Sequence, residues 1–207
     1  MSRFNFDHCR RRDAEIFDLA TRHPIIAAHV LNKFASPSAC YRRLGTLRER
    51  GKLKYVGSVQ LRDTGRPQDV YCNGWSVNTR HLFHEIKETD FLRCYEPDAQ
   101  IVRDPSRVDQ RINPDAEVIF PKTGRFFFVE IDTGTEDLGF VVDKWRRIYS
   151  KVREFLLVVT LSPVRMQHLI ERAEQVKEIA LFSTLDAVLA DPHGPVYCDA
   201  YGETGAI

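Results

Sequence analysis

An apolar run that ends in acidic residues occupies positions 125–136, where the sequence reads RFFFVEIDTGTE. Aromatic and β-branched side chains favour a pleated sheet, so the run predicts a β-strand over residues 125–132. Glu130 and Asp132 stand two positions apart, and residues two apart on a strand share one face. We therefore expect this strand to present two carboxylates side by side near its end.

The segments on either side of this strand predict a mixed sheet with helices. A turn at 121–124 joins it to a strand at 115–120, which places Asp115 near Glu130. The nearly all-apolar segment 155–160 predicts a central strand that is buried on both faces. Further strands are expected at 99–102 and 179–182, and helices at 79–92, 136–151 and 163–176. The expected fold class is α+β or α/β.

The N-terminal third predicts three helices followed by a β-hairpin. Asp13 can cap a first helix that ends at residue 23, and Pro24 suits the first turn of a second that reaches residue 31. A third helix is expected from Ser36 to residue 50, because Gly51 ends it. The hairpin is expected to comprise a strand at 53–61, a turn at 63–67 and a strand at 69–72.

Charge is divided unevenly along the 207-residue chain, whose formal net charge is +1. Residues 1–74 hold 14 Lys and Arg against 7 Asp and Glu, whereas the remainder holds 16 against 22. A basic part followed by an acidic part indicates a polyanion-binding module beside a second unit that could hold an acidic metal site. Ordinary variation in surface charge explains the same numbers equally well.

A three-helix unit with a basic third helix and a following hairpin resembles a winged helix-turn-helix. In that family the third helix enters the major groove of DNA, and the wing contacts the backbone or the minor groove. The resemblance implies double-stranded DNA as a partner. Base edges are expected to contact Ser38, Tyr41, Arg42 and Arg43, and phosphates are expected to contact Arg48, Lys52 and Arg66. Packing of the Tyr41 ring against the wing is an equal alternative.

Asp115, Glu130 and Asp132 are candidate catalytic acids at the shared end of the two paired strands, and Asp115 and Glu130 are the candidate metal ligands. Carboxylates that converge repel one another unless a cation neutralises them, and their hard oxygens suit Mg²⁺ or Mn²⁺. Such an ion can activate a water and stabilise a phosphoryl transition state. Asp132 has a second explanation, because an Asp side chain at this position can cap the helix that follows.

The tripeptides NPD at 113–115 and EID at 130–132, separated by a hairpin, resemble the PD-(D/E)xK nuclease superfamily. The resemblance implies that Asp115 and Glu130 hold the catalytic metal. Asp132 occupies the position of the superfamily's lysine, so Lys144 on the following helix is the candidate replacement, with a solvated helix face as the alternative. The candidates for an additional acidic ligand on the preceding helix are Glu85 and Glu88.

A wider pattern extends this likeness over residues 10–190 or so. The basic helical unit, the acidic strand pair, and then Lys144, Arg147 and Tyr149 together resemble the replication-relaxation family of plasmid and mobile-element proteins. The resemblance implies a role in plasmid replication or mobilisation, with a homodimer or a replication or mobilisation protein as a further partner. Two alternatives stay open: a degenerate scaffold that binds DNA or protein without cleavage, and a transcriptional regulator whose second domain dimerises or senses a ligand.

The expected division of the chain is a winged helix domain at 1–76, a nuclease-like domain at 77–190 and an irregular tail at 191–207. No apolar stretch approaches the ~20 residues that a membrane-spanning helix needs, and residues 1–6 do not form an apolar signal segment. We therefore expect a cytoplasmic protein without a membrane partner. Its five scattered cysteines are expected to be reduced thiols.

Overall fold

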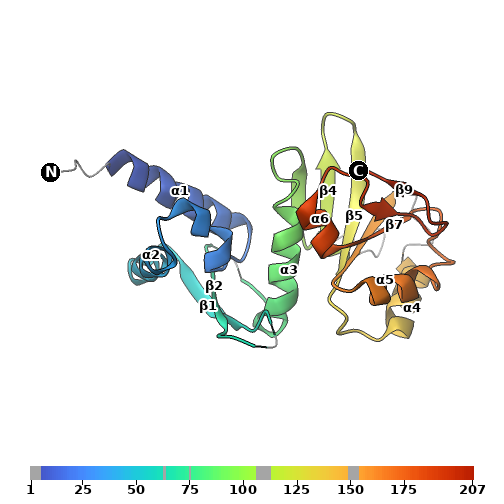
Figure 1. Cartoon of the computed structure of the whole chain (residues 1–207), viewed down its shortest axis with the longest axis horizontal. Helices are drawn as coiled ribbons and strands as arrows, with labels where there is room; N and C mark the ends of the chain where they lie inside the picture. The colour runs from blue at the N-terminus through green and yellow to red at the C-terminus, as the bar shows by residue number, and fades with distance from the viewer. Residues whose placement is uncertain (1–5, 63, 75, 106–112, 149–153) are drawn as a thin grey trace. The chain divides into compact units, whose positions relative to one another are not determined.

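The chain forms two compact units, Met1–Thr89 and Asp90–Ile207. The computed structural model describes residues 6–62, 64–74, 76–105, 113–148 and 154–207 (Figure 1). The division falls inside helix α3 (Leu82–Leu92), whereas the sequence analysis placed it at residues 76–77. Leu82 and Ile86 belong to the hairpin core of the first unit, and Phe91 belongs to the sheet core of the second, so the helix is divided between two cores.

The described part of the first unit contains a helix, two short 3₁₀ turns, a second helix, a hairpin and a third 3₁₀ turn that precedes α3. Its elements are α1 (Phe6–Arg22), η1 (Ala27–His29), η2 (Leu31–Lys33), α2 (Pro37–Glu49), β1 (Lys54–Val59), β2 (Gln68–Cys72) and η3 (Thr79–His81). The prediction for α2 is confirmed, because the Ser36 side chain accepts a hydrogen bond from the Ala39 N–H at 3.3 Å. Gly51 follows the helix with a φ of 66°, which suits glycine and ends the helix.

Two helix predictions for the first unit are wrong. Helix α1 begins at Phe6, before Asp13, so Asp13 lies inside the helix and does not cap it. The expected second helix is replaced by the turns η1 and η2. Ile25 pairs with Tyr71 through two backbone hydrogen bonds of 2.8 Å, which holds the chain extended where a helix was expected to start.

The core of the first unit joins α1 and α2 to the hairpin. Ile16 and Ala20 of α1 pack with Cys40 and Leu44 of α2, and all four are fully buried. The strands β1 and β2 pair antiparallel, with an irregularity between Tyr55 and Gly57. Gly57 has a φ of 153°, and a Cβ there would lie 2.8 Å from Leu82 Cδ1, so this position requires glycine. The hairpin is thus held against the start of α3.

The second unit contains a seven-stranded mixed sheet in the order β3-β4-β5-β6-β7-β8-β9. Its strands are β3 (Gln100–Arg103), β4 (Ala116–Phe120), β5 (Arg125–Asp132), β6 (Phe155–Thr160), β7 (Ala180–Thr184), β8 (Tyr197–Cys198) and β9 (Thr204–Gly205). Strands β5, β6 and β7 pair parallel, and the remaining pairs are antiparallel. The five predicted strands are confirmed, and β6 lies at the centre with Leu156–Thr160 buried.

Helices cover both faces of this sheet (Figure 1). Helices α4 (Leu138–Ile148) and α5 (Pro163–Ile170) pack on one face, where Trp145 and Leu169 contact the side of β5 that bears Phe128. Helix α6 (Leu185–Ala190) packs on the other face with Val129 and Leu157. The predicted mixture of helices and a mixed sheet is confirmed. In the described part of the chain, none of the helices has the length and apolar character needed to cross a membrane.

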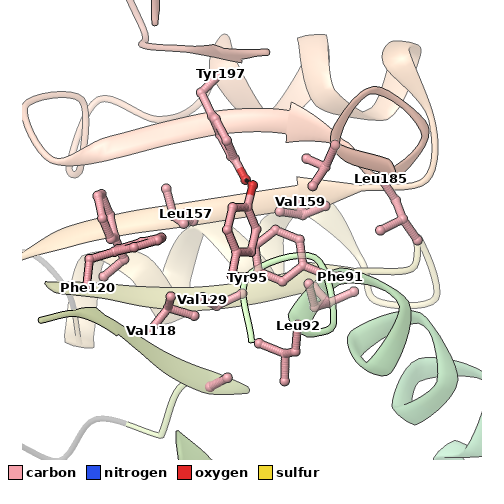
Figure 2. Close-up of a cluster of buried hydrophobic side chains, with 14 residues drawn as sticks. Phe91, Leu92, Tyr95, Val118, Phe120, Val129, Leu157, Val159, Leu185 and Tyr197 are labelled. Carbon is pink, nitrogen blue, oxygen red and sulfur yellow. Dashed lines mark hydrogen bonds between the residues drawn. The ribbon is translucent and has the colours of Figure 1, made fainter. Parts of the chain in front are cut away.

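The C-terminal segment is ordered into the sheet, so the prediction of an irregular tail is wrong for β8 and β9. Tyr197 of β8 is 1% exposed, and its hydroxyl lies 2.6 Å from that of Tyr95 (Figure 2). The Tyr95 hydroxyl donates to the Pro192 carbonyl at 3.0 Å, so it accepts the hydrogen bond from Tyr197. Burial raises the pKa of both phenols above its usual value. This buried pair fixes the tail to the core.

Candidate functional site

Polar side chains gather at one end of the sheet, on the face that α4 and α5 cover. Glu117 pairs with Phe128 across β4 and β5, so the next pair along the same face is Asp115 with Glu130. The Asp115 carboxylate accepts a hydrogen bond from the Ile131 N–H at 2.6 Å. The predicted proximity of Asp115 to the acidic end of β5 is therefore confirmed.

Lys144 reaches this end of the sheet from α4. Its ammonium donates to a carboxylate oxygen of Glu130 at 2.5 Å, and the side chains are 22% and 11% exposed. Val141 and Trp145 of the same helix are buried against the sheet, which holds Lys144 over Glu130. Burial opposes the charged form, but the charges of Glu130 and then Asp115 outweigh it and raise the pKa of Lys144. The lysine is thus a cation held between two acids.

The Asp132 carboxylate is paired with an arginine, Arg165, that the sequence did not indicate. The Arg165 guanidinium donates from Nε to Oδ2 at 2.8 Å and from Nη2 to Oδ1 at 3.2 Å, and the Asp132 side chain is 7% exposed. Arg165 also donates to the Glu136 carbonyl at 2.7 Å. This guanidinium therefore fixes the loop that joins β5 to α4. Its position at the start of α5, after the parallel strand β6, is the signal that could have indicated it.

The interpretation of Asp132 as a cap of the following helix is wrong. Asp132 accepts a hydrogen bond from the Gly134 N–H at 2.7 Å, which closes a turn before the helix begins. Helix α4 starts at Leu138, and the Asp137 side chain accepts from the Gly139 N–H at 2.8 Å. Asp137 is therefore the residue in the capping position.

The residues at this site fit a hard divalent cation only in part. Asp115 and Glu130 supply two carboxylates, which are the donors that Mg²⁺ and Mn²⁺ prefer, and such ions commonly complete their coordination with water. Across the residues that the structure describes, no group of three or more His, Cys, Asp and Glu side chains is placed to hold a metal. Glu85 and Glu88 are buried in the Met1–Thr89 unit, where the neighbouring Ile86 joins the hairpin core.

The outward face of α2 presents several of the predicted DNA-contacting residues. Ser38 and Arg42 are exposed, and Tyr41 is 52% exposed. The Tyr41 hydroxyl donates to the Gln68 side chain of β2 at 3.3 Å, so this residue contacts the hairpin with its tip while much of its ring stays accessible. Gly45 lies on the same side of the helix, and nothing lies within 4 Å of where its Cβ would be. This face of α2 can therefore approach a partner closely.

Arg43 differs from these neighbours because it is already paired. Its Nε donates to an Asp13 oxygen at 3.0 Å, and its Nη2 donates to the other oxygen. Burial raises the pKa of Asp13, but the hydrogen bonds and charge of Arg43 outweigh it and lower that pKa below its usual value. Arg43 therefore joins α2 to α1, and two of its guanidinium nitrogens are engaged with Asp13.

The predicted phosphate contacts lie near the hairpin. The Arg48 guanidinium lies 4.7 Å from the centre of the Tyr55 ring on β1, a cation–π contact. Lys52 and Arg66 are exposed. Asp63, in the predicted hairpin turn, lies outside the described residues, as does Tyr149, and the side chain of Arg147 is not described.

Comparison with known proteins gives no match, either to a protein-family model or to a curated protein. Two features of the described structure therefore bear on function. One is an acid–lysine cluster at the end of a mixed sheet, and the other is a basic helix beside a hairpin.

Proposed function

We propose that this protein binds double-stranded DNA in plasmid or mobile-element replication or mobilisation, and that its second unit is a nuclease-like domain of the PD-(D/E)xK type. The observation on which the proposal depends is the grouping of Asp115, Glu130 and Lys144. These residues come from the position just before β4, from β5 and from α4, yet they lie together at one end of the sheet. Two acids and a lysine are a set that metal-dependent phosphodiester hydrolysis can use.

The first unit supports the DNA-binding part of the proposal. Helix α1, the extended Ile25, helix α2 and the hairpin follow one another as in a winged helix-turn-helix, and Ile25 pairs beside β2. In such a unit α2 is the recognition helix and β1–β2 is the wing. The exposed Ser38 and Arg42 on α2 are then base-contacting residues, and Lys52 and Arg66 contact phosphates. The biological setting in this proposal rests on the resemblance of residues 10–190 or so to the replication-relaxation family.

Each residue of the acid–lysine cluster has a distinct role in this proposal. Asp115 and Glu130 would hold Mg²⁺ or Mn²⁺, which supplies an activated water and positive charge next to the phosphate. Lys144 would stabilise negative charge on the phosphoryl oxygens. It would thus replace the superfamily's lysine, whose position in the sequence is occupied by Asp132. Arg165 keeps Asp132 engaged and holds the loop before α4, so it positions Lys144 indirectly.

The Lys144–Glu130 contact also supports a second candidate function. The ammonium neutralises the carboxylate without any metal, so a divalent ion must compete with an existing ion pair. A domain in which Lys144 always wins this competition would be a scaffold that binds DNA or a partner protein without cleavage. A transcriptional regulator with such a domain would show no dependence on divalent ions.

Calorimetry with Mn²⁺, together with nicking of supercoiled plasmid, separates these functions. Asp115→Asn and Glu130→Gln keep the shape of each side chain and remove its charge, so both are expected to abolish Mn²⁺ binding and nicking. Asp143→Asn is the matched control, because Asp143 is an exposed acid on α4 that pairs with Arg146. Metal binding without nicking would indicate a scaffold that holds an ion but does not cleave, and duplex binding with neither would indicate the scaffold in which Lys144 keeps Glu130. Absence of metal binding and nicking would overturn the nuclease proposal, and absence of duplex binding at low salt would overturn the DNA proposal.

A further inference from the structure

A groove of about 580 Å³ lies between α1 and α2 within the first unit. Among the residues that the structure describes, its charged lining comprises five arginines and one acid, namely Arg10, Arg12, Asp13, Arg42, Arg43 and Arg50. The volume is within the range of about 300–1,000 Å³ that small-ligand sites occupy. The groove is therefore large enough for a ligand, and its charge favours an anion.

The one acid in this groove is already neutralised. Asp13 accepts hydrogen bonds from Arg43 and lies 3.4 Å from Nη2 of Arg12. Arg10, Arg42 and Arg50 have no side-chain hydrogen bond or ion pair with any described residue. The groove thus has an excess of positive charge, because no acid in the described parts of this unit pairs with these three arginines.

Arg12 adds an unsatisfied donor to this excess of charge. Its guanidinium lies 4.6 Å from the centre of the Phe34 ring, and its side chain is 17% exposed. Its Nε is buried and has no hydrogen-bond acceptor among the residues that the structure describes. A buried N–H group normally donates to an acceptor. The Arg12 Nε–H can therefore donate to an acceptor atom of a bound ligand.

We infer that this groove binds a phosphate-bearing anion. Guanidinium groups are planar, permanently charged and able to donate paired hydrogen bonds to phosphate oxygens, whereas this groove offers few groups to a cation or a neutral ligand. The phosphate can belong to a free compound such as a nucleotide or to the backbone of a nucleic acid. The site adjoins the proposed DNA surface, because Arg42 belongs to both. Its other arginines go beyond the proposed function, since the groove lies on the α1 side of α2, away from the contacts of Tyr41 and Arg48 with the hairpin.

Cys9 provides a direct probe of the groove. It is partly exposed and lines the groove, whereas Cys198 is a partly exposed thiol in the second unit. The rate of alkylation at each thiol can be followed by mass spectrometry of peptides from the full chain. Sodium pyrophosphate is expected to slow alkylation of Cys9 severalfold and to leave Cys198 unchanged. A short DNA duplex forms the second arm of the experiment.

Two neighbouring arginines provide a matched pair of variants. Arg10 lines the groove, whereas Arg11 does not, is 75% exposed and lies 3.9 Å from Glu15. Arg10→Ala and Arg11→Ala each remove one charge from α1, so a diffuse electrostatic effect would be equal in both. Arg10→Ala is expected to weaken anion binding about tenfold in calorimetry, the loss that one charge-assisted hydrogen bond accounts for. Arg11→Ala is expected to change it by less than about twofold, as for an exposed pair.

The outcomes separate the two sources of phosphate. If pyrophosphate protects Cys9 and this protection is lost in Arg10→Ala, the natural ligand is a free phosphate compound. Protection by duplex alone, again lost in Arg10→Ala, would indicate the nucleic-acid backbone. Protection by neither, or equal effects of Arg10→Ala and Arg11→Ala, would overturn the inference. A protein that binds pyrophosphate but no duplex would contradict the proposed DNA function and leave this site established.

Discussion

Charged side chains are arranged in opposite ways in the two units of the chain. In the first unit, Arg42, Arg50 and Lys52 are exposed, and no described residue pairs with their side chains. In the second unit, the charges at the end of the sheet satisfy one another, as in the contacts of Glu130 with Lys144 and Asp132 with Arg165. The cations of the first unit are therefore available to a partner, whereas the charges at the end of the sheet are neutralised by residues of the same fold.

This difference has energetic consequences. Exposed cations interact with a polyanion by releasing its counterions, so such binding is strongly salt-dependent and adds little to folding. Buried pairs add to the integrity of the fold, because removal of one partner leaves the other charge without compensation. We therefore expect substitutions of the unpaired cations of the first unit to affect mainly binding, and substitutions at the end of the sheet to affect both stability and chemistry.

The largest effect on stability is expected from Arg165→Ala. The variant leaves Asp132, whose side chain is 7% exposed, without its guanidinium, and breaking a buried pair costs about 3–5 kcal/mol. Arg146→Ala is the control, since Arg146 pairs with Asp143 at 62% and 58% exposure and such pairs contribute about 0–1 kcal/mol. Urea denaturation measures both. Equal losses of stability in the two variants would show that the pair at the end of the sheet contributes no more to stability than the exposed pair on α4.

Lys144→Met is expected to lower plasmid nicking about 100-fold or more, the cost of losing one charge-stabilising group. The same variant is expected to retain Mn²⁺ binding or to tighten it, because Glu130 loses the cation that competes with the metal. Lys122→Met, at a lysine that is 84% exposed, is the control. A loss of Mn²⁺ affinity in Lys144→Met would mean that the lysine supports the metal ligands and does not act on the phosphate.

Two adjacent arginines test the same contrast inside α2. Arg43→Ala is expected to cost about 1–2 kcal/mol of stability, because Asp13 loses a half-buried partner. Arg42→Ala is expected to leave stability unchanged within about 0.5 kcal/mol and to weaken binding to a preferred duplex by about 1–3 kcal/mol more than binding to random duplex, as for an arginine that contacts a base. Denaturation and gel-shift titrations with both duplexes measure the two properties. If Arg42→Ala destabilised the fold as much as Arg43→Ala, the distinction between paired and available cations would not hold.

Tyr197→Phe is expected to cost about 1 kcal/mol, the value of one hydrogen bond. Burial raises the pKa of Tyr95 and Tyr197, so the folded protein keeps these protons when unfolded tyrosines ionise near pH ~10. Their contribution to stability is therefore complete below that pH and falls as the pH rises through and above it. Denaturation at neutral and alkaline pH should show a steeper alkaline loss for the wild type than for Tyr197→Phe. Tyr201→Phe, at a tyrosine that is 62% exposed, is the control.

The sequence predicts those parts of the fold that local patterns determine. Ser36 and Gly51 mark both ends of α2, and apolar runs mark the five main strands. The errors arise where distant residues decide the structure: Ile25 is held extended by Tyr71, and the tail is held by the contact of Tyr197 with Tyr95, 102 residues earlier. Local spacing carries no information about either contact.

The candidate site shows the same limit. Asp115 and Glu130 could be placed together because one hairpin joins their strands, and Lys144 follows on the next helix. Arg165 could not be paired with Asp132, because that contact depends on the parallel pairing of β5 with β6 and on where α5 starts. Glu85 was predicted as an additional acidic ligand from the resemblance to the nuclease superfamily, and it lies in the Met1–Thr89 unit.

The smallest expected effect comes from Gly45→Ala, and it tests which face of α2 meets DNA. Glycine within a helix costs about 0.5–1 kcal/mol relative to alanine, and nothing lies within 4 Å of the added methyl group. The variant is therefore expected to be more stable by that amount in urea denaturation. If the outward face of α2 lies against the duplex, the methyl group occupies space that the DNA needs, and gel-shift affinity falls severalfold despite the gain in stability. A gain in stability with unchanged affinity would place the DNA contact elsewhere, and the exposed cations of α2 would then serve another anion.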